Sequence, residues 1–420
     1  MTAPNPDTDN LSLASLRDPA LRANPYPFYE RLRSHAPVHW DAAAGVEGGW
    51  VLTCHADVMA ALRDPRVSAG RLAPPPGADW LPAEYREAAR QVFRTMPHQL
   101  LFLDPPDHTR LRGLVSKAFT PRLVEAWRPR IVQLANELLD PVQEAGQMDV
   151  IASLAYPLPA IVIAELLGAP PDDREQFIRW SADFGGFLDG STLTTQEALL
   201  ALQGVADFME YFRGLIARRR TAPRDDLLQA LLTARERDDA LTEDELLANL
   251  VLLLAAGHGT TTHLIGNGLL ALLRHPEQFQ RLSANPSLIA TAVTELLRFD
   301  SPVQLTGRQV AQELSIGGVT LAAGQHITAI LGAANRDPDQ FPDPDRLDVG
   351  RPENRQLSFG YGIHFCLGAP LAKVEAEIVL STVTRRLPQL ALAPGAESAL
   401  EWQPSIVFRG LKSLPVVSAG

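Results

Sequence analysis

The sequence contains little that would suit a secreted, membrane or metal-cluster protein. Cys54 and Cys366 are its only cysteines in 420 residues, which excludes a disulfide framework and favours a reducing compartment. Two cysteines are also too few for an all-cysteine zinc or iron–sulfur site. The most apolar run, 250–257, is far shorter than the roughly 20 residues that cross a bilayer. The polar start MTAPNPDTDN has no secretion signal.

The sequence also has fewer basic than acidic residues. Lysine and arginine number 38 against 49 acidic residues, a formal net charge of −11. This balance argues against nucleic acid or a membrane surface as a partner. No repeat, low-complexity block or linker divides the chain. We therefore expect a cytoplasmic monomer with a flexible tail at 1–20 and a single domain at 21–420.

Helical patterns dominate the rest of the chain. The 34 prolines predict many sharply ended elements. Hairpins are predicted at 38–53 and at 314–321, where Gly317-Gly318 suits a two-residue primed turn. The pattern as a whole predicts a mainly α (α+β) fold of many helices with small, segregated β-sheets. Helices are predicted near 25–34, 55–63, 82–95, 107–118, 121–144, 152–167 and 369–386.

The longest predicted helix begins at Thr242, where Glu245 completes a capping box, and continues to Leu273. Its length is about 47 Å at ~1.5 Å per residue, and its apolar composition places it in the middle of the molecule.

The centre of this helix contains Gly257 and Gly259, each of which costs roughly 1 kcal/mol relative to alanine. Two interpretations remain open. The glycines allow close helix packing, or the helix opens locally beside a bound group. In the second case Thr260 can bond the Ala256 carbonyl or a ligand.

The strongest motif is FGYGIHFCLG at 359–368. Its three glycines let the backbone turn tightly and approach another group closely. The predicted helix at 369–386 follows, so Cys366 lies at a helix N-terminus, which favours the thiolate. A thiolate there can serve as a nucleophile or a metal ligand. An unreactive buried cysteine is the alternative, and the glycines favour the ligand.

Two charged pairs add to this motif. Glu295 and Arg298 lie one helical turn apart on one face, which alone would also fit a solvated ion pair. His108 and Arg112 share a face at i, i+4. That spacing suits an anionic group, although a solvated basic face is the alternative.

With these motifs in this order, the chain resembles the soluble bacterial cytochromes P-450, a superfamily of heme-thiolate monooxygenases, from about Leu21 to Val417. The segment 359–368 matches the heme-binding loop of the family at Phe359, Gly360, Gly362, Cys366 and Gly368. The resemblance implies the single-domain fold of the family. It also implies heme b, iron protoporphyrin IX, between the long central helix and the helix that follows Cys366.

The resemblance assigns roles to the other motif residues. Cys366 is implied as the axial iron ligand, with Phe359 and Gly368 as heme contacts. Glu295 and Arg298 match the Glu-x-x-Arg pair of the family, with Arg346 expected as their structural third partner. The residues expected to hold the heme propionates are His108, Arg112, Arg308 and His364. Those expected to contact substrate, with core packing as the alternative, are Leu103, Phe184, Leu252, Ala256, Gln304 and Val407.

One position departs from the family pattern. An acid followed by an alcohol usually delivers protons during oxygen activation, and this sequence has Gly259 before Thr260. We expect Thr260 to keep its catalytic role and ordered water to fill the space at Gly259. Peroxide, which brings its own protons, is then a competent oxidant. His258 is disfavoured as a substitute because it lies ~100° around the helix.

Electrons must come from outside, since no flavin or iron–sulfur motif is present. The resemblance implies ferredoxin and ferredoxin reductase fed by NAD(P)H, with dioxygen and an apolar small-to-medium organic molecule as substrates. Basic residues near Cys366 would suit an acidic ferredoxin, with scattered solvated charges as the alternative. These residues are Arg110, Lys117, Arg122 and Lys373.

Two other functions remain open. The first is a non-catalytic heme-thiolate protein that binds or senses a ligand, which the glycine at 259 favours. The second is a cysteine hydrolase that uses Cys366 and a histidine, which predicts a colourless protein.

Overall fold

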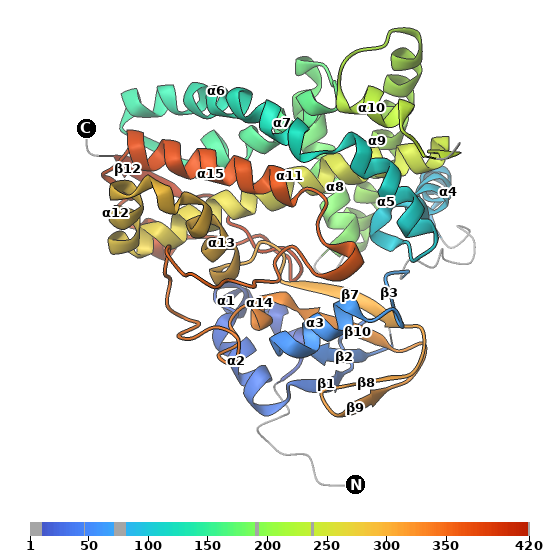
Figure 1. The fold of residues 1–420 in the computed structure, drawn as a ribbon, viewed down its shortest axis with the longest axis horizontal. Helices are drawn as coiled ribbons and strands as arrows, with labels where there is room; N and C mark the ends of the chain where they lie inside the picture. Colours follow the sequence, from blue (N-terminus) through green and yellow to red (C-terminus); the bar gives the residue numbers. More distant parts are fainter. Residues whose placement is uncertain (1–10, 46, 71–80, 190–192, 237–238, 419–420) are drawn as a thin grey trace.

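The structure, a computed structural model, describes residues 11–45, 47–70, 81–189, 193–236 and 239–418. Long helices form most of the molecule, and the largest sheet lies with the N-terminal helices at one end (Figure 1). The helices are α1 Pro19–Ala23, α2 Tyr26–His35, α3 His55–Arg63, α4 Arg86–Thr95, α5 Asp107–Ala118, α6 Pro121–Ala145, α7 Pro157–Leu166, α8 Arg174–Asp189, α9 Thr195–Thr221, α10 Leu227–Thr233, α11 Glu243–Arg274, α12 Pro276–Ala284, α13 Ile289–Phe299, α14 Leu331–Ala334, α15 Ala369–Arg386 and α16 Ala396–Ala399.

The strands within the described part of the chain form four small sheets. They are β1 Val38–Asp41, β2 Gly49–Leu52, β3 Val67–Ser68, β4 Gln147–Asp149, β5 Arg235–Glu236, β6 Asp239–Ala240, β7 Leu305–Val310, β8 Leu314–Ile316, β9 Val319–Leu321, β10 His326–Ile330, β11 Leu390–Leu392 and β12 Pro415–Ser418.

The largest sheet has the order β1-β2-β10-β7-β3. β10 runs parallel to β2 and antiparallel to β7, with Ile327 opposite Arg308. The other sheets are β11-β12-β4 and the hairpins β5-β6 and β8-β9. The mainly α prediction with small separate sheets is confirmed.

Most predicted elements are present with nearly the expected bounds. The hairpin at 38–53 is β1 and β2, and the hairpin at 314–321 is β8 and β9, with φ of +55° at Gly317 and +77° at Gly318. The helix predicted at 82–95 begins with a 3-10 turn before α4, and the one at 152–167 begins with a π turn before α7. The sequence analysis did not predict α8, α9, α10, α12 or α13. Thr194 caps α9 in a capping box with Glu197, a signal that could have located it.

The predicted tail at 1–20 is wrong for residues 11–20. These residues contain the 3-10 turn Leu13–Arg17 and the start of α1. Leu13 is buried and its N–H donates to the Asp41 carboxylate at 2.6 Å, while the Ser12 hydroxyl donates to the same carboxylate at 2.9 Å. Hydrophobic burial and this carboxylate hold the segment against β1. Residues 1–10 lie outside the described residues.

α11 runs through the middle of the helical part and contacts α7, α8, α9, α13 and α15 (Figure 1). Its capping box is confirmed: the Thr242 hydroxyl accepts from the Glu245 N–H at 3.2 Å, and Glu245 accepts from the Thr242 N–H at 2.9 Å. The helix stays continuous through Gly257 and Gly259, so the interpretation of local opening is wrong. A Cβ on Gly257 would lie 3.4 Å from Ile163 of α7, an ordinary contact distance, so packing against α7 does not by itself require glycine there.

No helix in the described ranges is long and apolar enough to cross a membrane. The same residues contain no cluster of three or more histidine, cysteine or acidic side chains that could hold a metal ion.

Candidate functional site

The segment before α15 folds into a tight loop around Cys366. Gly360 and Gly362 have φ of +71° and +73°, which only glycine adopts without strain. A Cβ on Gly362 would lie 2.5 Å from the Leu62 carbonyl oxygen. The Cys366 N–H donates to the Phe359 carbonyl at 2.9 Å and closes the loop. The sequence motif thus presents one sulfur atom from a rigid backbone.

The Cys366 thiol lies at the start of α15, as predicted. Burial raises its pKa, while the backbone N–H groups of Gly368 and Ala369 and the charge of Arg112 act in the opposite direction. These three groups favour the thiolate, and a bound metal would shift the balance fully to it.

Four basic side chains, which we call the basic cluster, gather near this loop from three elements: His108 and Arg112 of α5, Arg308 of β7 and His364. The rings of His108 and His364 have centroids 4.2 Å apart. Arg112 Nη2 donates to the Phe365 carbonyl at 2.6 Å. The structure therefore brings together the four residues that the sequence analysis grouped.

The basic cluster is short of negative charge. Burial, together with the charges of Arg308, His108 and Arg112, lowers the pKa of His364 to about 3. Burial, followed by the charge of Arg112, also lowers the pKa of His108. Asp104 opposes both shifts, but its carboxylate is engaged with the Ser68 hydroxyl and accepts from the Ala69 N–H at 2.9 Å.

Two hydrogen-bonding atoms of this cluster are unsatisfied. Nε2 of His108 and Nε2 of His364 are buried with no hydrogen-bond partner among the described residues. A buried unsatisfied polar atom costs about 1–3 kcal/mol. The basic cluster is therefore suited to an anionic group that would accept these hydrogen bonds.

A second feature is a row of residues on α11 that neighbouring elements leave uncovered, which we call the open stripe. Ala256 is exposed, and the other four are partly exposed, although the helix packs against other elements elsewhere. The stripe is therefore accessible to solvent or to a bound molecule. Its members are Leu252, Ala256, Gly259, Thr260 and His263.

The two predicted catalytic positions lie on this stripe. The Thr260 hydroxyl donates to the Ala256 carbonyl at 2.7 Å, one of the two partners that the sequence left open. A Cβ on Gly259 would meet no atom within 4 Å. His258 lies off the stripe, with Nδ1 bonded to the Ser181 hydroxyl and Nε2 to the Tyr156 carbonyl, both at 3.1 Å. This agrees with the prediction that His258 does not replace the missing acid.

The Glu295 cluster is formed by Glu295, Arg298, Arg351 and Asn354. Glu295 and Arg298 are fully buried, whereas Arg351 and Asn354 are partly exposed. Arg298 donates from Nε and Nη2 to Glu295, each at 2.7 Å. Arg351 Nε donates to both Glu295 oxygens at 3.1 Å, and Asn354 Nδ2 donates at 2.9 Å. Arg298 also bonds the carbonyls of Asn335 and Pro344.

The prediction that Arg346 is the third partner is wrong. The Arg346 side chain is exposed, and the residue contributes its carbonyl, which accepts from Arg298 at 3.2 Å and from Arg351 at 3.1 Å. The loop turns so that Arg351, five residues later, points inward. Sequence spacing alone could not choose between two arginines of one loop.

The predicted substrate contacts divide into two groups. Leu252 and Ala256 lie on the open stripe, and Leu103, after the turn Leu100–Phe102, is half-buried. Phe184 is 2% exposed and packs in the core of α8 and its neighbours, which is the alternative that the sequence left open.

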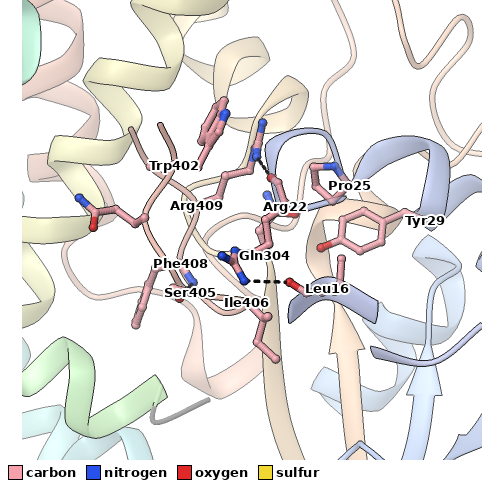
Figure 2. A pocket seen from close by; sticks show the side chains of 12 residues that line it. Leu16, Arg22, Pro25, Tyr29, Gln304, Trp402, Ser405, Ile406, Phe408 and Arg409 are labelled. Atoms are coloured by element: carbon pink, nitrogen blue, oxygen red, sulfur yellow. Dashed lines mark hydrogen bonds between the residues drawn. The ribbon is translucent and has the colours of Figure 1, made fainter. Parts of the chain in front are cut away.

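Gln304 and Val407 pair through their backbones at 2.8 Å. The Gln304 amide donates to the Ser301 carbonyl at 2.7 Å, and the side chain lines a pocket between the N-terminal segment and the C-terminal loop (Figure 2). Val407 packs against the buried cluster of that N-terminal segment. Neither side chain is placed on the open stripe.

Comparison with known proteins places these features in a family. Residues 201–390 match the model of the cytochrome P-450 family. The chain is 42% identical to vitamin D(3) 25-hydroxylase of Pseudonocardia autotrophica, over 94% of this chain and 93% of the relative. It is 41% identical to 6-deoxyerythronolide B hydroxylase of Saccharopolyspora erythraea, over 93% and 95%.

A solved structure is similar over nearly the whole chain. It is the cytochrome P-450 BioI in complex with an acyl carrier protein ligated to hexadec-9Z-enoic acid. The TM-score is 0.86 with 38% identity, covering 96% of this chain and 99% of that one.

Proposed function

Since this chain belongs to the cytochrome P-450 family of heme monooxygenases, we propose that Cys366 holds the heme iron and that the enzyme oxidises an apolar small-to-medium organic substrate. When bound, heme b with a thiolate ligand supplies the activation of dioxygen and the insertion of one oxygen atom. The residues of this chain bind and orient the heme, shape the substrate space and move protons.

The observation that carries this proposal is the unsatisfied basic cluster. Two propionates would accept hydrogen bonds from His108 and His364, whose buried Nε2 atoms have no partner in the described part of the chain. They would also form charge-assisted hydrogen bonds with Arg112 and Arg308. The residues present thus fit the acidic edge of heme.

Cys366 would hold the heme iron, because the glycine turns of its loop present its sulfur at a helix N-terminus. The loop hydrogen bond from Cys366 N–H to Phe359 fixes the backbone. N–H groups near the sulfur tune how strongly it donates electron density.

We place the open stripe at the opposite wall of the proposed site, because α11 packs against α15, the helix that follows Cys366. Thr260 holds a hydroxyl there, and Gly259 leaves room for ordered water beside it. Leu252 and Ala256 are the apolar surface offered to a substrate. An apolar substrate also agrees with the relatives, whose names refer to vitamin D(3), a deoxyerythronolide and a hexadecenoic acyl group.

We propose that electrons reach this site from NAD(P)H through ferredoxin reductase and an acidic ferredoxin. Arg110 does not belong to the docking surface, since it pairs with Glu245 and with Asp239 at 3.3 Å. Partly exposed Lys373 has its Nζ 5.8 Å from the ring centroid of Phe359 in the Cys366 loop, and Arg122 is exposed near the start of α6. Raising the ionic strength should slow ferredoxin-driven reduction, and a flat salt response would count against this surface.

Labelled dioxygen tests the function directly. The purified holoprotein, supplied with ferredoxin, its reductase and NAD(P)H, should incorporate one atom of ¹⁸O from ¹⁸O₂ into a fatty acid or steroid probe that shifts the heme spectrum. A ligand-sensing protein would show the spectral shift without labelled product. A parallel reaction with hydrogen peroxide measures whether the glycine at 259 permits turnover without the electron partners.

A further inference from the structure

The segment that leads into α5 contains four apolar residues whose burial alternates. Leu100 and Phe102 are buried, whereas Leu101 and Leu103 are partly exposed. The segment forms a single 3-10 turn, in which the Phe102 N–H donates to the Gln99 carbonyl at 3.0 Å. One short turn has little stability of its own. Its position must therefore come from bonds to neighbouring elements.

Asn249 of α11 ties the start of this segment to the long helix. The residue is 1% exposed, and its Oδ1 accepts from the Leu100 N–H at 3.0 Å. Its Nδ2 donates to the His98 carbonyl at 3.1 Å and to the Glu245 carbonyl of its own helix at 2.7 Å. The bond to Glu245 orients the amide on the helix, and the other two bonds fix the loop on both sides of Gln99.

A second amide adds to this attachment. Gln99 is fully buried, and its Nε2 donates to the Ala248 carbonyl at 3.1 Å. Its bonding is less complete than that of Asn249, since Gln99 Oε1 has no partner among the described residues. Three consecutive residues of the loop, 98–100, are thus bonded to two consecutive residues of α11.

The far end of the segment is fixed separately. The Asp104 carboxylate accepts from the hydroxyl of Ser68 in β3 and, at 2.9 Å, from the N–H of Ala69. The two partly exposed leucines therefore lie on a short stretch that is bonded to α11 on one side and to β3 with its following residue on the other.

The attachment to α11 lies next to the open stripe. Leu252 and Ala256 follow Asn249 by three and seven residues, which places all three on one side of the helix. Leu103 follows the bonded Leu100 by three residues as well. The amide of Asn249 therefore joins the two apolar surfaces that we expect the substrate to contact.

We propose that Asn249 is a positioning residue that decides which carbon atom of the substrate is oxidised. The inference rests on the proposed monooxygenase function and adds no chemical step to it. By fixing the loop against α11, the amide fixes Leu101 and Leu103 relative to Leu252 and Ala256, and so holds an apolar substrate in one orientation. A displacement of about 1 Å can change a rate by about 100-fold, so a loosened loop should redistribute oxidation among neighbouring carbon atoms.

The first experiment measures the attachment itself and needs no activity. Asn249→Leu keeps a branched side chain but removes all three side-chain hydrogen bonds. In the holoprotein, hydrogen–deuterium exchange of the Leu100 N–H should become about 10-fold faster than in wild type, because this buried donor loses its acceptor. Unchanged exchange would show that other contacts hold the loop, and would overturn the proposal.

The second experiment measures where oxygen is inserted. The holoprotein is supplied with ferredoxin, its reductase, NAD(P)H and hexadecanoic acid, or testosterone if the fatty acid gives no shift of the heme spectrum. In Asn249→Leu the ratio of the hydroxylated positions should change at least about threefold, and the probe concentration for a half-maximal spectral shift should rise about 10-fold.

A second variant and a control separate this role from stability. Gln99→Met removes the bond to Ala248 together with the unsatisfied Oε1, so it should fold like wild type and shift the product ratio in the same direction as Asn249→Leu, but by less. Asn267→Leu is the control. Asn267 is also 1% exposed on α11, and its Nδ2 donates to the Arg409 carbonyl at 2.9 Å, outside the loop, so its loss should lower stability and keep the product ratio.

A product ratio that stays at the wild-type value in both loop variants, or that changes equally in Asn267→Leu, would contradict the proposal. A failure of the proposed function looks different. Wild type would then give no labelled product, whereas the exchange of the Leu100 N–H would still respond to Asn249→Leu.

Discussion

The Glu295 cluster and the basic cluster use similar side chains but differ in how fully they are bonded. Glu295 accepts from Arg298, Arg351 and Asn354, and Arg298 donates from all three of its nitrogens. The basic cluster instead contains two buried nitrogen atoms with no partner among the described residues. In the Glu295 cluster every charged group is paired and Asn354 Oδ1 is the one atom without a partner among the described residues, so this cluster serves the fold. The basic cluster lacks an anion for its buried histidine nitrogens, which indicates a missing ligand.

The largest expected effect is a loss of unfolding free energy when the Glu295 cluster loses its carboxylate. Glu295→Leu leaves the buried Arg298 and its neighbour Arg351 without their anion and should cost about 3–5 kcal/mol of unfolding free energy. Urea unfolding of the protein with and without heme measures the loss. Glu397→Leu is the matched control, because it breaks an exposed pair with Arg274 at 2.6 Å and should cost less than about 1 kcal/mol. Equal losses would remove the distinction between the two kinds of cluster.

A substitution in the basic cluster should affect heme affinity rather than the stability of the heme-free protein. His364→Phe removes an unsatisfied nitrogen, so the unfolding free energy of the heme-free protein should stay the same or rise. Heme affinity should fall by about 1.5–3 kcal/mol, roughly 10- to 100-fold, as measured by absorbance titration of heme into the heme-free protein.

His55→Phe is the matched control for that measurement. His55 Nε2 is bonded to the Arg355 carbonyl at 2.8 Å, so this substitution should lower stability and leave heme affinity unchanged. If His364→Phe behaves like His55→Phe, the basic cluster is structural and the comparison fails.

A smaller difference in stability is expected between substitutions of Arg351 and Arg346, the two arginines of the loop that follows α14. Arg351→Ala removes a guanidinium that donates to both Glu295 oxygens, and we expect it to cost about 2 kcal/mol. Arg346→Ala removes an exposed side chain and keeps the carbonyl that accepts from Arg298, so its cost should stay within about 0.5 kcal/mol. Thermal unfolding of the two variants ranks them, and the reverse order would show that Arg346 belongs in the cluster.

The last prediction concerns Glu375 on α15, a buried carboxyl group that also has an unsatisfied oxygen. Burial raises the pKa of Glu375 well above its usual value, and its Oε2 has no partner among the described residues. The raised pKa in the folded state means that stability is fully present below the unfolded pKa of about 4.3 and falls as the pH rises.

Glu375→Gln removes this titration. The variant should match wild type in unfolding free energy near pH 4 and exceed it by about 1 kcal/mol or more at pH 7. Urea unfolding across that range checks the difference, and a constant offset at every pH would contradict it.

The sequence predicted best the features that depend on residues close together in the chain. Local signals located α11 by its capping box, the β8-β9 turn by its two glycines and the Cys366 loop by its motif. In the basic cluster, helical spacing paired His108 with Arg112, and resemblance to a family added Arg308 and His364.

Long-range packing accounts for what sequence reasoning missed. The choice of Arg351 over Arg346 depends on how one loop turns. The burial of Leu13 depends on Asp41 and β1. The attachment of Leu100 to α11 becomes visible only when Asn249, 149 positions away in the chain, is placed beside it.

The central claim is that the basic cluster and the Cys366 loop together hold one heme through a thiolate. The spectrum of the reduced, carbon-monoxide-bound protein tests it most directly, with Cys54→Ser as the control for Cys366→Ser. Wild type and Cys54→Ser should show the spectrum of thiolate-ligated heme, and Cys366→Ser should lose it. A thiolate spectrum that survives in Cys366→Ser would contradict the assignment of Cys366 as the ligand.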